Sequence, residues 1–210
     1  MICILATNNP NKARELRALF ALSGLELKCL EDLGLSYTPW EDGLTFEENA
    51  MQKAVETANY IRRYTLQSEL SDYIVLADDS GLVIDALDGK PGVDSSLFLG
   101  VDTTYEVRNA YIIEQMKDVP EEKRTARFVC AVACILPDGE RISTSATMEG
   151  RIAYTPTGVK GFGYDPVFLL PEENRTMAQL TLEEKNAISH RGKAMMHMLQ
   201  TLEVACPWKS

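Results

Sequence analysis

Residues 2–12 read Ile2-Cys3-Ile4-Leu5-Ala6-Thr7-Asn8-Asn9-Pro10-Asn11-Lys12. The short apolar run at the start of this stretch predicts a buried strand. Pro10 opens an amphipathic segment that extends to Leu22, and proline suits the first position of a helix because the N–H it lacks would have no partner there. The stretch therefore predicts a strand, a tight polar turn and a helix N-terminus, as in α/β proteins.

The polar turn of this unit, Thr7-Asn8-Asn9, is a candidate phosphate site. Free N–H groups and the positive end of the helix dipole favour anions at a helix N-terminus, and Lys12 adds a mobile positive charge. The alternative is an ordinary capped turn that binds nothing, since asparagine is a common N-cap residue. The spacing matches neither the P-loop nor the G-x-G-x-x-G fingerprint.

The composition is that of an ordinary globular protein, with 45% apolar and 25% charged residues in 210. This length allows one sizeable core in a single domain that can fold as two lobes. The formal net charge of −10 argues against nucleic-acid and anionic-membrane partners, which require a basic surface. A polyanionic ligand would therefore need a local cluster of cations or a metal. Neither a signal peptide nor a membrane span is expected.

The five cysteines indicate a reducing compartment. Their number is odd, no CxxC pair occurs, and three of them lie in apolar strand-like runs. We therefore expect buried free thiols in the cytoplasm. A zinc site is not expected, because the chain has only two histidines, His190 and His197, and no paired ligand spacing.

Helix and strand signals indicate a mixed α/β sheet. Capping boxes predict helices after Thr45, Thr103 and Thr181, the first extending to about Leu66, and Ser189 is expected to cap the last helix. Strands are predicted at 2–6, 26–30, 73–77, 82–85, 127–136, 141–148 and 167–170. The turn at 137–140 predicts a hairpin between two of these strands.

Two adjacent carboxylates follow the predicted strand at 73–77. Asp78 and Asp79 repel each other unless a cation intervenes, and open α/β folds bind ligands at strand ends. Hard oxygen ligands in an anion-binding protein indicate Mg²⁺ bridged by substrate phosphates. The alternative is a simple turn, because Asp, Ser80 and Gly81 are common turn residues.

The helix after Thr45 adds further candidates. Glu41 or Asp42, just before it, could complete the metal site or could be solvated loop charges. Asn49 and Lys53 share one helix face at i, i+4 spacing. Lys53 would point either to the phosphates or to solvent, which is the default for a lone lysine.

The segment Gly161–Pro166 offers contacts for a nucleotide base. Its two glycines allow the backbone to approach a ligand closely, and Phe162 and Tyr164 present ring faces for stacking. The alternative is an aromatic turn before a strand.

A cluster of donors follows at 184–193. His190 and Arg191 could hydrogen-bond a base edge or ribose, and Lys185 could reach a phosphate. Basic residues in the first turn of a helix oppose the helix dipole, so this cluster needs another reason to be there.

Together these elements resemble the inosine triphosphate pyrophosphatase family. The matching motifs follow the family's order and span nearly the whole chain. They are Ala6-Thr7-Asn8-Asn9 with Lys12 and Glu15, Thr45-Phe46-Glu47-Glu48-Asn49-Ala50 with Lys53, Ala77-Asp78-Asp79-Ser80-Gly81-Leu82, Pro91-Gly92, Gly161 to Phe168, and Ser189-His190-Arg191-Gly192.

The resemblance implies an α/β fold with an elongated two-lobed mixed β-sheet flanked by helices and a nucleotide cleft between the lobes. It also implies a homodimer that depends on Mg²⁺. The implied reaction cleaves deaminated (6-oxo) purine nucleoside triphosphates, such as ITP, dITP and XTP, to the monophosphate and pyrophosphate.

Residue roles follow from the resemblance position by position. Asp79 would be the catalytic acidic residue and a metal ligand. The substrate would be contacted by Thr7, Asn8, Asn9, Lys12, Lys53, Ser80, Phe162, Gly163, Tyr164, Asp165, Lys185, His190 and Arg191.

The chain also departs from the family's pattern. Leu97 stands where an arginine is usual, and Asn8 replaces the commoner glycine. Trp40 stands where many members carry an acid, so the neighbouring Glu41 is our candidate for the second metal ligand.

Two other functions remain open at this point: a pyrophosphatase for other modified nucleotides, and a nucleotide-binding sensor without turnover. The aspartyl-phosphate class is disfavoured because it would need Asp-x-Asp after the strand, whereas the two acids here are adjacent.

Overall fold

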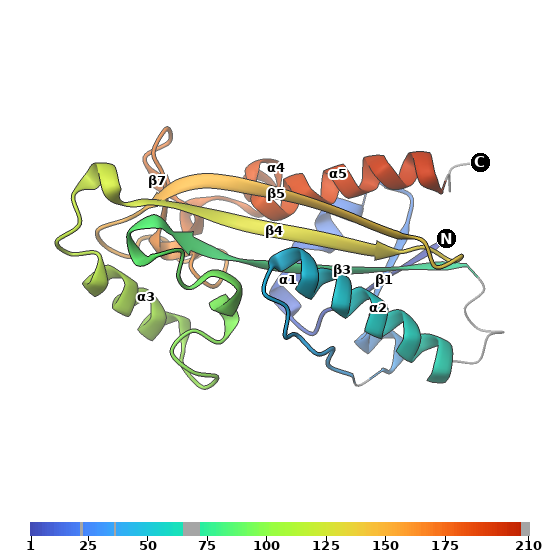
Figure 1. Ribbon diagram of the computed structural model, residues 1–210. Coiled ribbons are helices and arrows are strands. Elements are labelled where there is room, and N and C mark those ends of the chain that lie inside the picture. The colour runs from blue at the N-terminus through green and yellow to red at the C-terminus, as the bar shows by residue number, and fades with distance from the viewer. Residues whose placement is uncertain (22, 36, 65–71, 207–210) are drawn as a thin grey trace. The chain divides into compact units, whose positions relative to one another are not determined.

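The computed structural model describes residues 1–21, 23–35, 37–64 and 72–206. Its helices are α1 (Pro10–Phe20), α2 (Phe46–Tyr64), α3 (Tyr105–Gln115), α4 (Leu182–Ile188) and α5 (His190–Ala205). Its strands are β1 (Ile2–Leu5), β2 (Glu26–Cys29), β3 (Tyr73–Ile84), β4 (Thr125–Ile135), β5 (Arg141–Ile152), β6 (Phe168–Leu170) and β7 (Arg175–Thr176), as Figure 1 shows.

The strands form one sheet in the order β2-β1-β3-β4-β5-β6-β7. β1 is parallel to both β2 and β3, whereas β6 is antiparallel to both β5 and β7. The predicted mixed α/β class is therefore confirmed. Among the described residues, no helix combines the length and the apolar character that a membrane crossing requires.

The chain divides into two compact units, each made of separate stretches of sequence. Unit 1 consists of residues 1–79, 130–146 and 191–210, and unit 2 consists of residues 80–129 and 147–190. The boundaries fall inside β3, β4 and β5.

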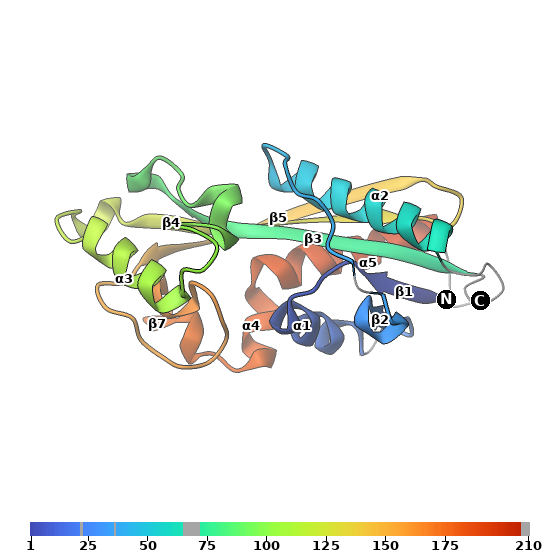
Figure 2. The same ribbon diagram turned by 90° about the horizontal axis from the view of Figure 1, so that it is seen from below.

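Unit 1 buries its parallel strands on both faces. Cys3 and Leu5 of β1 belong to a core cluster with Leu16 of α1 and Met195 of α5. Figures 1 and 2 show α2 on the opposite face of the strands from α5. Helix α2 buries one face, on which apolar residues recur about one helical turn apart: Ala50, Ala54, Ala58 and Ile61. Cover on both faces explains why β1 reads as a continuous apolar run.

Unit 2 has a separate core. Ile112 of α3 packs in a cluster with Phe128 of β4 and Phe168 of β6, and the last two rings lie 4.5 Å apart between centroids. The hairpin predicted at 137–140 is present between β4 and β5 in unit 1, where the N–H of Gly139 donates to the carbonyl of Leu136 at 2.9 Å.

One strand prediction was wrong. Segments 73–77 and 82–85 were expected as two strands separated by a turn, but β3 runs without interruption over Tyr73–Ile84. Asp78 and Asp79 therefore lie in the middle of a buried strand. They can do so because each carboxylate has at least one cationic side chain beside it, as described below, which offsets part of the cost of burying a charge.

The helix starts were largely as predicted. Thr45 and Thr181 each accept a hydrogen bond from the glutamate N–H three positions later. The cap of α3, however, is Thr104 and not Thr103, whose hydroxyl donates to the carbonyl of Leu99. The predicted helix ends at Leu22 and Leu66 lie outside the described residues.

Candidate active site

The turn between β1 and α1 has the predicted geometry. Asn9 caps α1, because its Oδ1 accepts from the backbone N–H groups of Asn11 and Lys12 at 3.0 and 3.3 Å. Pro10 occupies the first turn of the helix. The side chain of Lys12 is thereby directed from a fixed helix start and reaches Asp78 Oδ2 at 2.9 Å.

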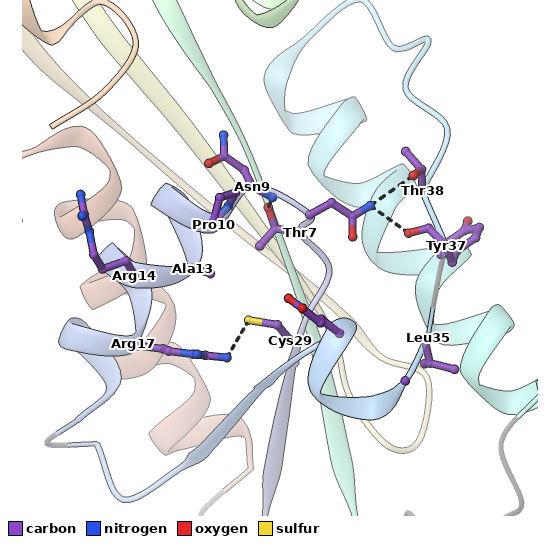
Figure 3. Close-up of a pocket in the computed structure, with 13 residues that line it drawn as sticks. Thr7, Asn9, Pro10, Ala13, Arg14, Arg17, Cys29, Leu35, Tyr37 and Thr38 are labelled. Carbon is purple, nitrogen blue, oxygen red and sulfur yellow. Dashed lines mark hydrogen bonds between the residues drawn. The ribbon is translucent and has the colours of Figure 1, made fainter.

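The same turn lines a cavity of about 610 Å³ in unit 1. Figure 3 shows Thr7 and Asn9 on one side of it, Arg14 and Arg17 along α1, and Tyr37 opposite. The two arginines were not among the predicted site residues, because an arginine on an amphipathic helix is most often a solvated charge.

Asn8 connects the turn to a neighbouring segment. Its Nδ2 donates to the carbonyl of Tyr37 at 2.9 Å and lies 3.2 Å from the hydroxyl of Thr38. Asn8 therefore uses the side chain that a glycine at this position would lack.

Asp78 lies at the centre of a buried charge network. Its Oδ2 accepts from Lys12 and from Arg191 Nε at 3.2 Å. Burial alone would raise the pKa of Asp78, but the Lys12 and Arg191 cations hold it well below its usual range. The other end of Arg191 donates to Glu15 Oε2 at 2.6 Å. Arg191 is 3% exposed. Its guanidinium therefore serves first as the partner of the Asp78 and Glu15 carboxylates.

Asp79 lies next to this network and faces helix α2. Its Oδ1 is 3.1 Å from Lys53 Nζ, and its Oδ2 accepts from Asn49 Nδ2 at 3.2 Å. Burial raises the pKa of Asp79 above its ordinary value, with Lys53 opposing that change. Lys53 does not point to solvent, the default expectation, because its ammonium is buried and also lies 3.1 Å from Glu41 Oε1.

Asp79 and Glu41 fit a magnesium ion by the chemistry of their donors. Their oxygens converge on one cation, the Lys53 ammonium. Mg²⁺ is held by one or two carboxylates where substrate phosphates supply further oxygens. In the part of the chain that the structure describes, no three His, Cys, Asp or Glu side chains are grouped as metal ligands. Waters and substrate phosphate oxygens would supply the other ligands of such an ion.

A second polar cluster lies in unit 2. Lys185 and Asp165 form a buried ion pair, and the Lys185 ammonium lies 4.8 Å from the centre of the Phe162 ring. Asp165 Oδ2 also accepts from the Phe162 N–H at 2.8 Å. A Cβ on Gly161 would come within 2.0 Å of that oxygen, so glycine is required for this close approach. The cluster holds Phe162 in place.

Tyr164 takes a different place from the one expected. Its ring is 4% exposed and belongs to the core of unit 2, and its hydroxyl donates to the carbonyl of Ser95 at 2.8 Å. Of the two rings predicted to stack on a base, only Phe162 keeps surface exposure. Gly163 adopts a left-handed φ of 68° in this turn, and its carbonyl accepts from Asn109.

His190 also belongs to unit 2. Its ring stacks on Phe128 with centroids 4.7 Å apart and 13° between the planes, and it is 4% exposed. Ser80 lies half-buried in β3. The unit 1 cluster around Asp78 and Asp79 brings together the predicted residues Lys12, Lys53, Glu41 and Arg191, with Glu15 and Asn49, which the site prediction left out. The unit 2 cluster brings together Phe162, Asp165 and Lys185. The other predicted residues take the separate places given above: Thr7, Asn8, Asn9, Ser80, Gly163, Tyr164 and His190.

The fold and these clusters define an α/β protein with paired carboxylates, buried lysines and an ordered aromatic turn. The chain belongs to the Ham1 family, whose model matches residues 3–201.

Curated relatives and solved structures agree with this assignment. A dITP/XTP pyrophosphatase of Exiguobacterium sibiricum is 45% identical over 195 residues, which is 93% of each chain. One of Bacillus subtilis is 39% identical, covering 95% of this chain and 96% of the relative. The Ham1 protein of Staphylococcus aureus has a TM-score of 0.82 at 32% identity, covering 98% of this chain and all of that one. The resemblance stated from the sequence is confirmed.

Proposed function

We propose that this chain hydrolyses deaminated purine nucleoside triphosphates, such as ITP, dITP and XTP, to the monophosphate and pyrophosphate. The observation that carries the proposal is the position of Asp79. Its carboxylate is buried, is held by Lys53 and Asn49, and faces Glu41 across the Lys53 ammonium. Two relatives that carry the name dITP/XTP pyrophosphatase, 45% and 46% identical to this chain, support the substrate class.

In the proposed reaction a water molecule attacks the α-phosphorus and pyrophosphate leaves. Asp79 orients this water and accepts its proton on a carboxylate oxygen. Lys12 and Lys53 stabilise the negative charge that develops on the leaving group. Asp79 and Glu41 would hold Mg²⁺, which would supply further charge neutralisation when bound.

Base selection is assigned to two residues of unit 2, Phe162 and His190. Phe162 provides a stacking face, and His190 with its ring held on Phe128 provides a donor for the 6-oxo group. Adenine would leave that donor without an acceptor, which is costly in a buried site.

The test is product analysis with inosine triphosphate. We expect pyrophosphate as the first product with Mg²⁺, and no turnover in chelator. Orthophosphate as the first product would refute the reaction, and binding without turnover would identify a sensor. A panel of modified pyrimidine triphosphates shows whether the substrate class is correct.

Single variants then test the site. Asp79→Asn should lower kcat by about 100-fold or more, as expected for a general base, in a protein that still melts cooperatively. Glu41→Gln should weaken activation by Mg²⁺. The matched control is Asp42→Asn, which makes the same chemical change one residue away and should leave both quantities unaltered.

We also propose that the protein is a cytoplasmic homodimer. The family resemblance supports the dimer, and the five free cysteines support a reducing compartment. Light scattering on the purified protein should give twice the monomer mass, and a monomer would refute this part.

A further inference from the structure

Helix α2 holds the segment that carries Glu41 by its backbone. Side-chain oxygens spaced along one side of α2 accept hydrogen bonds from the N–H groups of residue 40 and of residues 42–45. The acceptors are Glu56 for Trp40 at 2.9 Å, Gln52 for Asp42 at 3.5 Å, Asn49 for Gly43 at 2.8 Å, and Glu48 for Leu44 and Thr45 at 2.8 and 3.2 Å. We call this set the α2 ladder.

Asn49 differs from the other members of the α2 ladder because it also touches Asp79. Its Oδ1 accepts from the Gly43 N–H, while its Nδ2 donates to Asp79 Oδ2 at 3.2 Å. A backbone N–H can only donate, so the oxygen of the amide must face Gly43 and its nitrogen must face the carboxylate. Asn49 is 4% exposed.

The backbone at Gly43 is shaped for this contact. A Cβ at this position would lie 2.8 Å from Asn49 Oδ1 and 2.8 Å from the Cβ of Glu48, so any larger residue would force the segment away from α2. The Glu41 segment is therefore held closely against Asn49.

Asn49 and Lys53 together fix both oxygens of Asp79. They lie one helical turn apart on α2 and donate to Oδ2 and Oδ1 respectively, which determines the plane of the carboxylate. Lys53 also contacts Glu41. Glu41 and Asp79 are thus connected twice through α2. Lys53 contacts both carboxylates, and Asn49 bonds Asp79 and the backbone of the Glu41 segment.

We propose that Asn49 is a positioning residue for hydrolysis, which holds the Asp79 carboxylate and the Glu41 segment in one fixed geometry. This inference rests on the proposed function. Asn49 acts through Asp79 and Gly43, and supporting residues of this kind typically change activity by about 10- to 100-fold.

Three variants separate the two hydrogen bonds. Asn49→Ala removes both. Asn49→Asp keeps an acceptor for the Gly43 N–H but replaces the donor to Asp79 with a like charge. Gln52→Ala is the matched control, because Gln52 belongs to the α2 ladder without touching Asp79.

Two readouts are needed. Steady-state kinetics with inosine triphosphate and Mg²⁺ give kcat and KM, and hydrogen exchange of residues 40–45 in metal-free, substrate-free protein reports the segment itself. We expect kcat to fall about 10- to 100-fold in both Asn49 variants with KM changed by less than about threefold. Exchange of the Gly43 amide should accelerate in Asn49→Ala and stay slow in Asn49→Asp. Gln52→Ala should keep the wild-type kcat.

The outcomes are distinct. If the wild-type protein releases no pyrophosphate, the proposed function fails, and the exchange data alone then decide whether Asn49 holds the segment. If the wild type is active, an Asn49→Asp variant with unchanged kcat would overturn the positioning role. So would a Gln52→Ala variant that loses as much kcat as Asn49→Ala, because the effect would then come from general loosening of the α2 ladder.

Discussion

Arg191 donates a 2.6 Å hydrogen bond to Glu15, although 176 positions separate them in the sequence. Both side chains are buried, at 3% and 1% exposure, and Arg191 also contacts Asp78. The pair thus connects the first and last helices of unit 1 to the strand that carries the acidic residues.

We predict that Glu15→Ala destabilises the fold by about 1.5–3 kcal/mol, because it removes one of the two carboxylates that pair with the buried guanidinium of Arg191. The free energy of unfolding in urea measures this. Arg151→Ala is the control, since its pair with Glu121 is largely exposed and should contribute less than about 1 kcal/mol. A loss in Glu15→Ala no larger than that of the control would mean that the buried pair contributes little.

Lys12→Ala should raise KM for inosine triphosphate about tenfold or more, as expected for a lost charged contact. The fold should be retained because Asp78 keeps Arg191 as a partner. Lys28→Ala, which removes the same charge from a surface pair with Glu26, should leave KM unchanged. Equal effects of the two variants would show that the overall field of the protein, and not a contact of Lys12, controls substrate binding.

His190→Phe should reduce the preference for inosine triphosphate over ATP. The phenyl ring can keep the stack on Phe128, but it has no donor for O6. We therefore expect kcat/KM to fall for inosine triphosphate and to change little for ATP. His190→Ala should reduce the preference equally and also lower the melting temperature. A preference that falls only in the alanine variant would point to packing and not to the donor.

Stability should decrease in alkaline solution because of two buried thiols. Burial raises the pKa of Cys130 to about 12, with Asp78 contributing, and that of Cys134 to about 12, from an ordinary value of 9.0. A group whose pKa is raised in the folded state contributes its full stability below the unfolded pKa and loses it as pH rises through the folded one.

The free energy of unfolding should therefore fall between pH 9 and 12 by up to about 1.4 kcal/mol per pH unit for each thiol. Urea titrations at several pH values check this, and the slope should be shallower in a Cys130→Ala, Cys134→Ala double variant. In the native protein at pH 8, a thiol reagent should modify the half-buried Cys206 before either of them.

Local signals in the sequence were reliable where one residue determines one backbone feature. Pro10 and Asn9 predicted the start of α1, and Thr181 with Glu184 predicted the start of α4. Such features depend on hydrogen bonds within a few residues, which the sequence contains in full.

Features that depend on distant partners could not be predicted in the same way. Asp78 and Asp79 looked like the end of a strand because two carboxylates interrupt an apolar run. Their partners Lys12, Lys53 and Arg191 come from three different helices, and only the folded chain brings these cations to β3. Tyr164 was misplaced for a similar reason, because the carbonyl that accepts from its hydroxyl is 69 residues away.

The α2 ladder has a consequence for which residues of the Glu41 segment can be substituted. Because α2 holds this segment through backbone N–H groups, the hydrogen bonds of the α2 ladder at 40 and 44 do not depend on which side chains stand there. Trp40 and Leu44 are 66% and 87% exposed. Substitutions at either position should therefore leave Glu41 in register. Selection should instead act on α2, where each acceptor side chain must stay long enough to reach its backbone N–H group.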